Sequence, residues 1–140
     1  MAKLTLDIEY EYDFILLGIS CHLKDYRLCW AINSGNMGID FVKADELVIQ
    51  LKKQEEPSIF SQFIYDDDDN NLCFNLIANR GTQGYLIPEQ KQADYLLMIT
   101  GNFTEGQTKS LLTEIKKIDF ILTAFTIDVE SLKSKQNLLF

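Results

Sequence analysis

The chain has 140 residues, of which 46% are hydrophobic and 24% charged, with nine phenylalanines and six tyrosines. This composition is typical of one folded domain over residues 1–140 and excludes an intrinsically disordered chain. The formal net charge is -8, and the only adjacent basic pairs are Lys52-Lys53 and Lys116-Lys117. Nucleic acids and anionic membrane surfaces attract clustered lysine and arginine, so we expect neither as a partner.

The cysteines indicate a reducing compartment. Cys21, Cys29 and Cys73 are an odd number and lack the short spacing of a disulfide framework or a zinc site. We interpret them as reduced thiols of a cytoplasmic protein, and we expect no cofactor and no metal. The opening residues alternate apolar and charged side chains, unlike the apolar core of a signal peptide. The apolar stretch at 14–19 is far shorter than the roughly 20 residues that span a membrane.

The first half of the chain mixes strand and helix patterns. Residues 3–11 alternate apolar with polar or acidic side chains, which predicts a strand with one buried face. The next segment predicts a helix over residues 21–34, with Ser20 as its cap. Two short β-prone pieces follow, IDFV at 39–42 and ELVIQL at 46–51.

The middle of the chain carries turn signals between aromatic and β-branched runs. SIFSQFIY (58–65) and LCFNLIAN (72–79) flank the turn-forming DDDDNN (66–71), which predicts a hairpin. RGTQG (80–84) predicts another turn, after which YLI (85–87) begins a return strand.

The strongest helix signal comes late. DYLLMIT, residues 94–100, is apolar on both faces, so we expect a strand in the middle of a sheet. Thr104 and Gln107 have the spacing of a capping box, and the apolar residues that follow recur with helical period. A helix over residues 105–118 is therefore predicted, followed by a strand over 120–127.

These elements together predict an α+β fold, with a mostly antiparallel sheet and two main helices packed on one face. The last residues predict a short helical turn in which Leu132 is packed. No internal repeat or second domain is evident, so we expect residues 1–140 to form a single α+β domain.

The sequence contains only weak matches to catalytic, ligand-binding or metal-binding motifs. Gly101 and Gly106 have the glycine spacing of a phosphate loop, but lysine does not follow directly, so the segment 104–109 is only a minor candidate for phosphate or nucleotide binding. The run Asp66–Asp69 favours an exposed hairpin tip, because the glycine and final acid of a calcium loop are missing. His22 is the sole histidine. We predict no catalytic residue and no metal ligand.

Tyr26 and Trp30 are interpreted as part of the buried stripe of the helix predicted over 21–34. Arg27 lies on the same predicted face, so we expect it to be a buried partner for an acid from the sheet, since arginine is often anchored by carboxylates.

The segment LIPEQKQADYLLMIT raises the question of a reactive site. Pro88 lacks a donor and should end one strand, and Asp94-Tyr95 should begin the next, so a corner between two strands is predicted. Glu89 and Asp94 could instead converge across the turn, and paired carboxylates suit general acid and base catalysis. No nucleophile, histidine or metal set accompanies them, which favours the corner.

The same residues resemble a bacterial family named for the pattern IPExxxVDY. Ile87-Pro88-Glu89 matches its first half and Asp94-Tyr95 its end, while Ala93 stands where the family name has valine. The segment HLKDYRLCWAIN and the ending SLKSKQNLLF are also similar to this family. The resemblance implies no catalytic or binding residue, because the family has no assigned biochemical function.

We expect a non-enzymatic domain that acts through protein contact and is able to self-associate. The candidate anchors are exposed aromatic side chains, drawn from Trp30, Phe60, Phe63, Tyr65 and Phe125. The alternative is a small-molecule-binding domain or enzyme with a pocket formed by Pro88, Glu89, Asp94, Tyr95 and Arg27.

Overall fold

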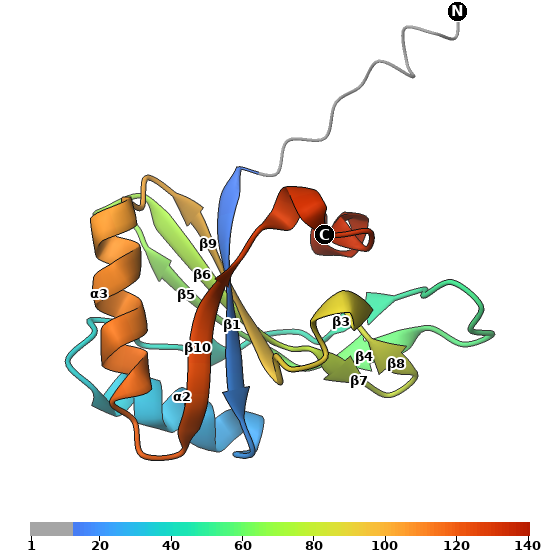
Figure 1. Cartoon of the computed structure of the whole chain (residues 1–140), viewed down its shortest axis with the longest axis horizontal. Coiled ribbons are helices and arrows are strands. Elements are labelled where there is room, and N and C mark those ends of the chain that lie inside the picture. Colours follow the sequence, from blue (N-terminus) through green and yellow to red (C-terminus); the bar gives the residue numbers. More distant parts are fainter. Residues whose placement is uncertain (1–12) are drawn as a thin grey trace, which may run out of the picture.

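The computed structural model describes residues 13–140 and has an α+β fold (Figure 1). Its strands are β1 (Phe14–Cys21), β2 (Val42–Lys43), β3 (Leu47–Ile49), β4 (Ser58–Phe60), β5 (Gln62–Asp67), β6 (Leu72–Ala78), β7 (Arg80–Gly81), β8 (Gly84–Tyr85), β9 (Tyr95–Gly101) and β10 (Ile121–Ile127). Its α-helices are α2 (Asp25–Ser34) and α3 (Glu105–Lys116), and its 3-10 segments are η1 (Pro88–Gln90), η2 (Val129–Ser131) and η3 (Lys135–Leu138). The main sheet is antiparallel, in the order β10-β1-β9-β6-β5-β2, and two small sheets pair β3 with β4 and β7 with β8. The predicted fold class is confirmed.

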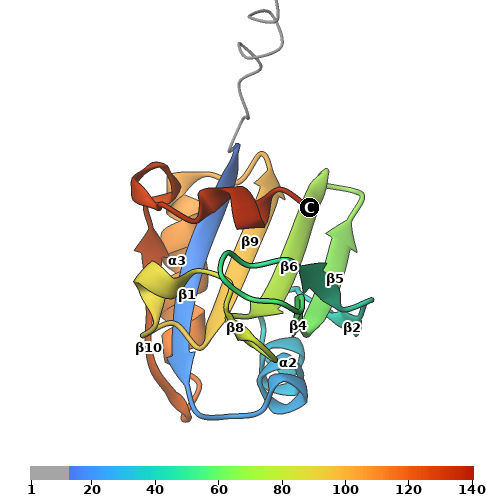
Figure 2. The same ribbon diagram turned by 90° about the vertical axis from the view of Figure 1, so that its right-hand side faces the viewer.

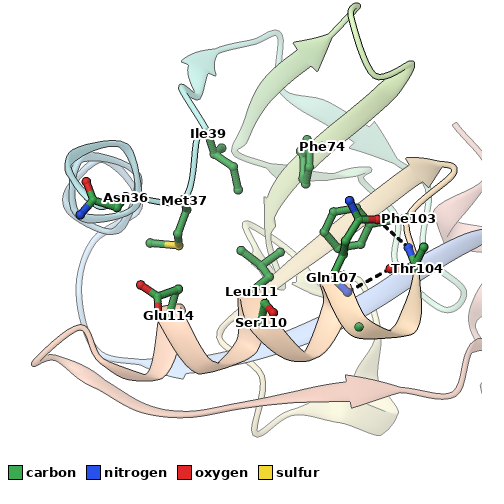
Figure 3. Close-up of a pocket in the computed structure, with 11 residues that line it drawn as sticks. Asn36, Met37, Ile39, Phe74, Phe103, Thr104, Gln107, Ser110, Leu111 and Glu114 are labelled. Carbon is green, nitrogen blue, oxygen red and sulfur yellow. Dashed lines mark hydrogen bonds between the residues drawn. The ribbon is translucent and has the colours of Figure 1, made fainter.

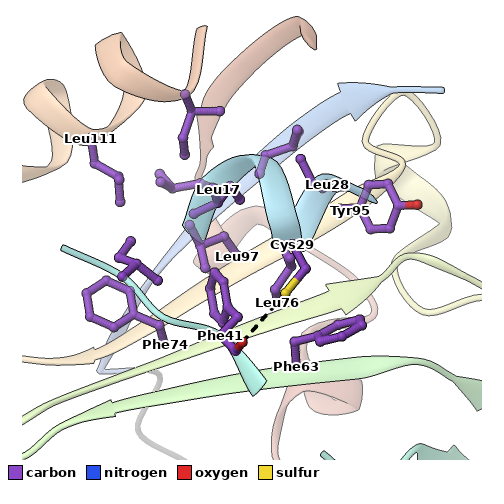
Figure 4. Packing of buried hydrophobic residues seen from close by; sticks show 14 of the residues in the cluster. Leu17, Leu28, Cys29, Phe41, Phe63, Phe74, Leu76, Tyr95, Leu97 and Leu111 are labelled. Atoms are coloured by element: carbon purple, nitrogen blue, oxygen red, sulfur yellow. Dashed lines mark hydrogen bonds between the residues drawn. The ribbon is translucent and has the colours of Figure 1, made fainter. Parts of the chain in front are cut away.

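Strand β9 lies inside the sheet, between β1 and β6, as the apolar run at 94–100 predicts. Its side chains alternate between two cores. Leu97 and Ile99 pack on the face that the α-helices cover, which we call the helix face (Figure 4). Leu96 and Met98 pack on the opposite face, which we call the tail face. Burial on both faces explains why the strand has no polar alternation.

Both α-helices lie on the helix face, as predicted. Leu28 and Ile32 of α2 and Leu111 and Ile115 of α3 are each 6% exposed or less and belong to one core with β1 and β9. Burying one such side chain fully contributes roughly 1.5–3 kcal/mol. The helices and this face of the sheet therefore stabilise each other.

The capping box predicted for α3 is confirmed. The Gln107 backbone N–H donates to Thr104 Oγ1 at 3.1 Å, and the Thr104 backbone N–H donates to Gln107 Oε1 at 2.8 Å. Two donors that have no partner within the helix are thereby satisfied. These bonds fix the start of α3 directly after the β9 turn.

The helix predicted over residues 21–34 is wrong at its start. Residues 14–21 form strand β1, and α2 begins only at Asp25, after Lys24 in an extended conformation. Ser20 pairs with Thr123 of β10 and caps no helix. A short apolar run does not distinguish a buried strand from a helix by its period alone, and here pairing on both sides of β1 decides it. The strand predicted over 3–11 lies outside the described residues.

The hairpin predicted around DDDDNN is confirmed as β5 and β6, joined by a turn in which Asn71 has φ of 54°. The return strand predicted at 85–87 is shorter than expected. Only Tyr85 belongs to β8, and Leu86 and Ile87 leave the small sheet to enter the core of the tail face, where both are fully buried.

The C-terminal residues cover the tail face of the sheet together with the small sheets (Figure 2). Val129, Leu132 and Leu138 are buried there, which confirms the packed helical turn predicted around Leu132. Within residues 13–140, neither α-helix has the length and apolar character needed to cross a bilayer.

Candidate functional site

The segment 87–95, which we call the corner motif, joins β8 to β9. Pro88 is the first residue of η1, a position where its missing N–H needs no helical partner. The chain then turns and enters β9 at Tyr95. The predicted corner is confirmed, although the preceding strand ends at Tyr85, before the proline.

Asn79 holds the corner motif from inside the protein. Its side chain is fully buried, and its Nδ2 donates to the carbonyl oxygens of Gln90 at 2.9 Å and Ala93 at 3.0 Å. Its Oδ1 accepts the backbone N–H of Ile87 at 2.8 Å. The buried polar groups of the turn thus depend on one amide side chain. Sequence reasoning missed this residue, and the available signal was a polar residue that ends the apolar run LCFNLIAN.

Asp94, near the C-terminal end of the corner motif, is hydrogen-bonded to β1. Its backbone N–H donates to the carbonyl oxygen of Ile19 at 2.9 Å, and its Oδ2 accepts the backbone N–H of Cys21 at 2.8 Å. The carboxylate therefore replaces a strand partner at the point where the β1–β9 pairing ends. Its role in the described structure is to bind the main chain.

Glu89 binds a different segment. Its two carboxylate oxygens accept hydrogen bonds from the backbone N–H and the hydroxyl of Ser134, both at 2.8 Å. Partial desolvation raises the pKa of Glu89, but hydrogen bonds, first those from Ser134, outweigh it, so the net pKa is lowered. The C-terminal segment is thereby attached to the corner motif.

The predicted pocket residues do not face one common cavity, because Asp94 and Tyr95 bind the segment around Cys21 and Leu23, whereas Glu89 binds Ser134. The Tyr95 hydroxyl donates to the carbonyl oxygen of Leu23 at 2.5 Å, and burial raises the pKa of Tyr95 far above its usual range. Pro88 is exposed beside Ser134, in a shallow depression. Glu89 binds the C-terminal segment while Asp94 binds β1, so the two carboxylates serve different contacts.

The Glu89–Ser134 contact predicts a pH-dependent stability. The pKa of Glu89 is lower in the folded chain than in the unfolded chain, so its contribution is present above pH 4.5 and is lost as the pH falls through the folded-state value. Replacing Ser134 with alanine should lower the melting temperature at pH 7 and make no difference near pH 2. Because Glu89 is exposed, we expect less than about 1 kcal/mol. Ser131→Ala is the control, since that hydroxyl binds a carbonyl oxygen; an equal pH dependence in both variants would refute the assignment.

The thiols are poorly suited to nucleophilic chemistry. Burial raises the pKa of Cys21 and Cys29, and burial together with a hydrogen bond to Asp66 raises the pKa of Cys73 to about 11. Cys29 Sγ lies 3.7 Å from the Phe41 carbonyl oxygen (Figure 4). Thiolate is the reactive form, so all three should react slowly.

Thiol titration tests this property. At pH 8 Cys73 in the native protein should react with Ellman's reagent about 100-fold more slowly than glutathione, because its pKa of about 11 leaves roughly one thiolate in 1,000. Cys21 and Cys29, whose pKa burial raises, should also react more slowly than glutathione. In guanidinium chloride all three cysteines should react at the rate of free thiols. One equivalent of fast-reacting thiol in the folded state would contradict the expected reduced, unreactive cysteines.

The acidic tip carries its own local contacts. Asp67 accepts hydrogen bonds from the Asn70 side chain at 2.9 Å and its backbone N–H at 3.3 Å, which closes the β5–β6 turn. No group of three metal-ligating side chains occurs within residues 13–140.

The outer side of α2 is the most exposed aromatic surface of the described chain. Trp30 is 71% exposed and Tyr26 60% exposed, and with Arg27 they form a shallow depression that we call the α2 face. The prediction that both aromatics belong to the core stripe is wrong. The helix begins four residues later than predicted, and its buried residues are Leu28, Cys29 and Ile32.

Arg27 is exposed, in contrast to the predicted buried ion pair. The ion pairs of the described residues are Lys117–Glu114 and Lys135–Glu130, and neither includes Arg27. Of the other predicted aromatic anchors, Phe60 and Phe63 are buried, and Tyr65 and Phe125 are half-buried. Trp30 is thus the anchor candidate that remains open to solvent.

A second concave surface lies between α3 and the loop that follows α2, with a volume of about 490 Å³. Figure 3 shows apolar side chains at its base and polar side chains at its rim. The apolar residues are Met37, Ile39, Phe74, Phe103 and Leu111, and the polar ones are Asn36, Thr104, Gln107, Ser110 and Glu114. We call it the α3 groove. Phe74 and Phe103 meet edge to face there, with centroids 5.8 Å apart.

Comparison with known protein families, curated proteins and solved structures finds no match to this chain. The resemblance to the IPExxxVDY family stays a prediction.

Proposed function

We propose that the chain is a non-enzymatic protein-interaction module that contacts its partner through the α2 face. The observation that carries the proposal is the exposure of Trp30 and Tyr26, at 71% and 60%, in one depression with the exposed Arg27. Tryptophan, tyrosine and arginine are the residues most enriched among those that dominate binding energy at interfaces. Membership in the IPExxxVDY family, a cytoplasmic location and the lack of nucleic-acid binding belong to the same proposal.

The position of Tyr26, Arg27 and Trp30 on α2 favours contact with a partner protein over a role in folding. Their side chains project from the side of α2 opposite Leu28 and Ile32, so the helix keeps its core without them. An exposed tryptophan leaves a large apolar area in water, and covering it in a complex recovers part of that free energy. Arg27 adds a donor group for carboxylates or carbonyls of a partner.

The contacts of the corner motif also favour a non-enzymatic role. An enzyme or ligand site at Glu89, Asp94 and Tyr95 needs side chains free to face a common molecule. Here Asp94 accepts from Cys21, Glu89 accepts from Ser134, and Tyr95 donates to Leu23. These contacts favour a role in holding the fold together.

Site-specific photo-crosslinking in the native cell tests the proposal. Tyr26 is replaced by p-benzoylphenylalanine, which keeps an aromatic group on the α2 face and leaves Trp30 intact. The matched control is the same probe at Val48 on β3, which is 61% exposed against 60% for Tyr26. We expect discrete adducts from position 26 that position 48 does not give. An adduct of twice the chain mass would identify a second copy, and identical products from both positions would contradict the proposal.

The α3 groove favours a second candidate function, the binding of a small apolar molecule. Its volume of about 490 Å³ and its apolar base are typical of ligand sites. The neutral dye Nile red should then bind saturably with increased emission. Ser110→Trp, which fills the rim, should abolish this signal, whereas Ser110→Ala should retain it. Equal emission from both variants, or no increase in emission with the wild type, would exclude the α3 groove as a binding site for this dye.

A further inference from the structure

One end of the α3 groove lies close to the point where the described residues begin. Phe14, the first residue of β1, pairs with Thr100 of β9. Three residues after Thr100, Phe103 lines the groove. Consecutive Cα atoms are about 3.8 Å apart and paired strands about 5 Å apart, so the groove begins within about 20 Å of Asp13.

Twelve residues precede Asp13 and lie outside the described structure. We call residues 1–12 the N-terminal segment. Fully extended, a chain of this length spans about 40 Å, roughly twice the distance to the near end of the groove. The segment is therefore long enough to enter the α3 groove of its own molecule.

The chemistry of the N-terminal segment matches the base of the groove. The segment has an apolar or aromatic side chain at every second position, namely Leu4, Leu6, Ile8, Tyr10 and Tyr12. Such residues share one side of an extended chain. Figure 3 shows the apolar side chains of the groove facing the space between α3 and the loop after α2. Covering them with the apolar side of the segment removes both surfaces from water.

The groove also accommodates the acidic residues of the N-terminal segment. Asp7, Glu9 and Glu11 alternate with the apolar residues, so they lie on the opposite side of an extended chain and can stay in water. Among the groove residues, which all belong to the described part of the chain, Glu114 alone is charged, and Lys117 binds its carboxylate at 2.7 Å. The groove therefore repels the segment little.

A second hollow near Phe14 suits the segment less well. It is lined by residues 14–16 and 126–130, which include the acids Asp128 and Glu130. Lys135 binds Glu130 at 3.4 Å, but Asp128 belongs to no ion pair of residues 13–140. Its charge repels a segment that has three acids and one base, Lys3. The charges thus favour the α3 groove over this hollow.

We propose that the N-terminal segment of the same molecule occupies the α3 groove through its apolar side chains. The inference deepens the second candidate function, because the segment and a small apolar molecule compete for one groove. It rests on the α3 groove as a binding site, but its test uses no added ligand, so the two proposals can fail separately.

Intramolecular photo-crosslinking of the full chain tests the proposal. Leu6 is replaced by p-benzoylphenylalanine, whose ketone reacts with C–H groups in direct contact. Irradiation of the purified protein should give a product at the 16.1 kDa mass of one chain. Peptide mass spectrometry should then find position 6 joined to the groove, at Met37 or Leu111.

Variants on both sides of the contact provide the controls. In the chain with the probe at position 6, Leu4→Asp together with Ile8→Asp should reduce the cross-link yield at least about tenfold, because carboxylates are costly to bury in an apolar groove. Thr5→Asp, on the polar side of the segment, should retain the yield. Ser110→Trp, which fills the rim, should also abolish the cross-link, whereas Ser110→Ala should retain it.

The other products would overturn the proposal. These are a cross-link to residues 126–130, a product of twice the chain mass, which would place the segment on a second copy, or no cross-link to the groove. The groove cross-link without Nile red binding would support the segment and reject the small-molecule function. Saturable Nile red binding without the groove cross-link would do the reverse.

Discussion

Replacing Asn79 with alanine should lower the free energy of unfolding by about 3–5 kcal/mol, the largest effect expected of a polar substitution in this chain. The change leaves the N–H of Ile87 and the carbonyl oxygen of Ala93 without their side-chain partner inside the protein, whereas the half-buried carbonyl oxygen of Gln90 keeps the N–H of Ala93 at 3.0 Å. Each unsatisfied buried group costs roughly 1–3 kcal/mol. Urea denaturation followed by far-UV circular dichroism measures the difference.

Asn75 provides the matched control, because it is also a buried asparagine associated with β6. Its amide donates one hydrogen bond, to Gln62 Oε1 at 2.8 Å, and its Oδ1 accepts from the Cys73 thiol at 3.5 Å. Asn75→Ala should therefore cost about 1–2 kcal/mol, clearly less than Asn79→Ala. Equal losses in the two variants would mean that Asn79 does not hold the corner motif.

Replacing Gly101 with alanine should cost about 2–4 kcal/mol. Gly101 has φ of 116°, a left-handed conformation that side chains rarely adopt, and an added Cβ would lie 2.3 Å from the carbonyl oxygen of Asn71. Backbone strain of this kind costs roughly 1–3 kcal/mol, and overpacking costs a similar amount. Thermal unfolding measured by circular dichroism reports the loss.

Gly106 gives the opposite expectation in the same experiment. It lies inside α3, and an added Cβ would approach nothing closer than Thr104 Oγ1 at 3.9 Å. Gly106→Ala should stabilise the protein by about 0.5–1 kcal/mol, because alanine loses less backbone entropy in a helix. A destabilised Gly106→Ala together with a tolerated Gly101→Ala would contradict the described turn between β9 and α3.

The elements that sequence reasoning predicted well have signals that need no distant partner. The capping box and helical period of α3 lie within 15 residues, and the β5–β6 hairpin is defined by its own turn. Strand β9 is apolar on both faces, and only an inner strand covered on both sides accommodates that pattern. In these segments the conformation that the local sequence favours is the one found in the folded protein.

Strand β1 and helix α2 could not be placed in this way. The run at 14–21 suits a strand or a buried helix equally, and pairing with β9 and β10, about 80 to 110 residues later, decides the conformation. The prediction also took the stripe with Tyr26 and Trp30 as the buried side of the helix, whereas the structure buries the stripe of Leu28, Cys29 and Ile32. Both stripes contain apolar residues, and only contact with the sheet decides between them.

The sequence predicted the corner motif as a turn, but it did not predict which residues its side chains bind. Glu89 binds Ser134 and Asp94 binds Cys21, contacts separated by 45 and 73 residues in the sequence. No local pattern specifies such pairs, and the choice between a structural and a reactive pair of acids depended on them. Asn79, which holds the turn, carries no signal beyond being polar in an apolar run.

The most direct test of the account compares two substitutions in the chain that carries p-benzoylphenylalanine at position 26. The α2 face is the proposed partner contact, whereas Glu89 attaches the C-terminal segment through Ser134. Trp30→Ala should therefore reduce the adduct yield at least about tenfold, as expected for a residue that dominates an interface, while Glu89→Ala should leave the yield unchanged. An adduct that survives Trp30→Ala and disappears with Glu89→Ala would contradict the account.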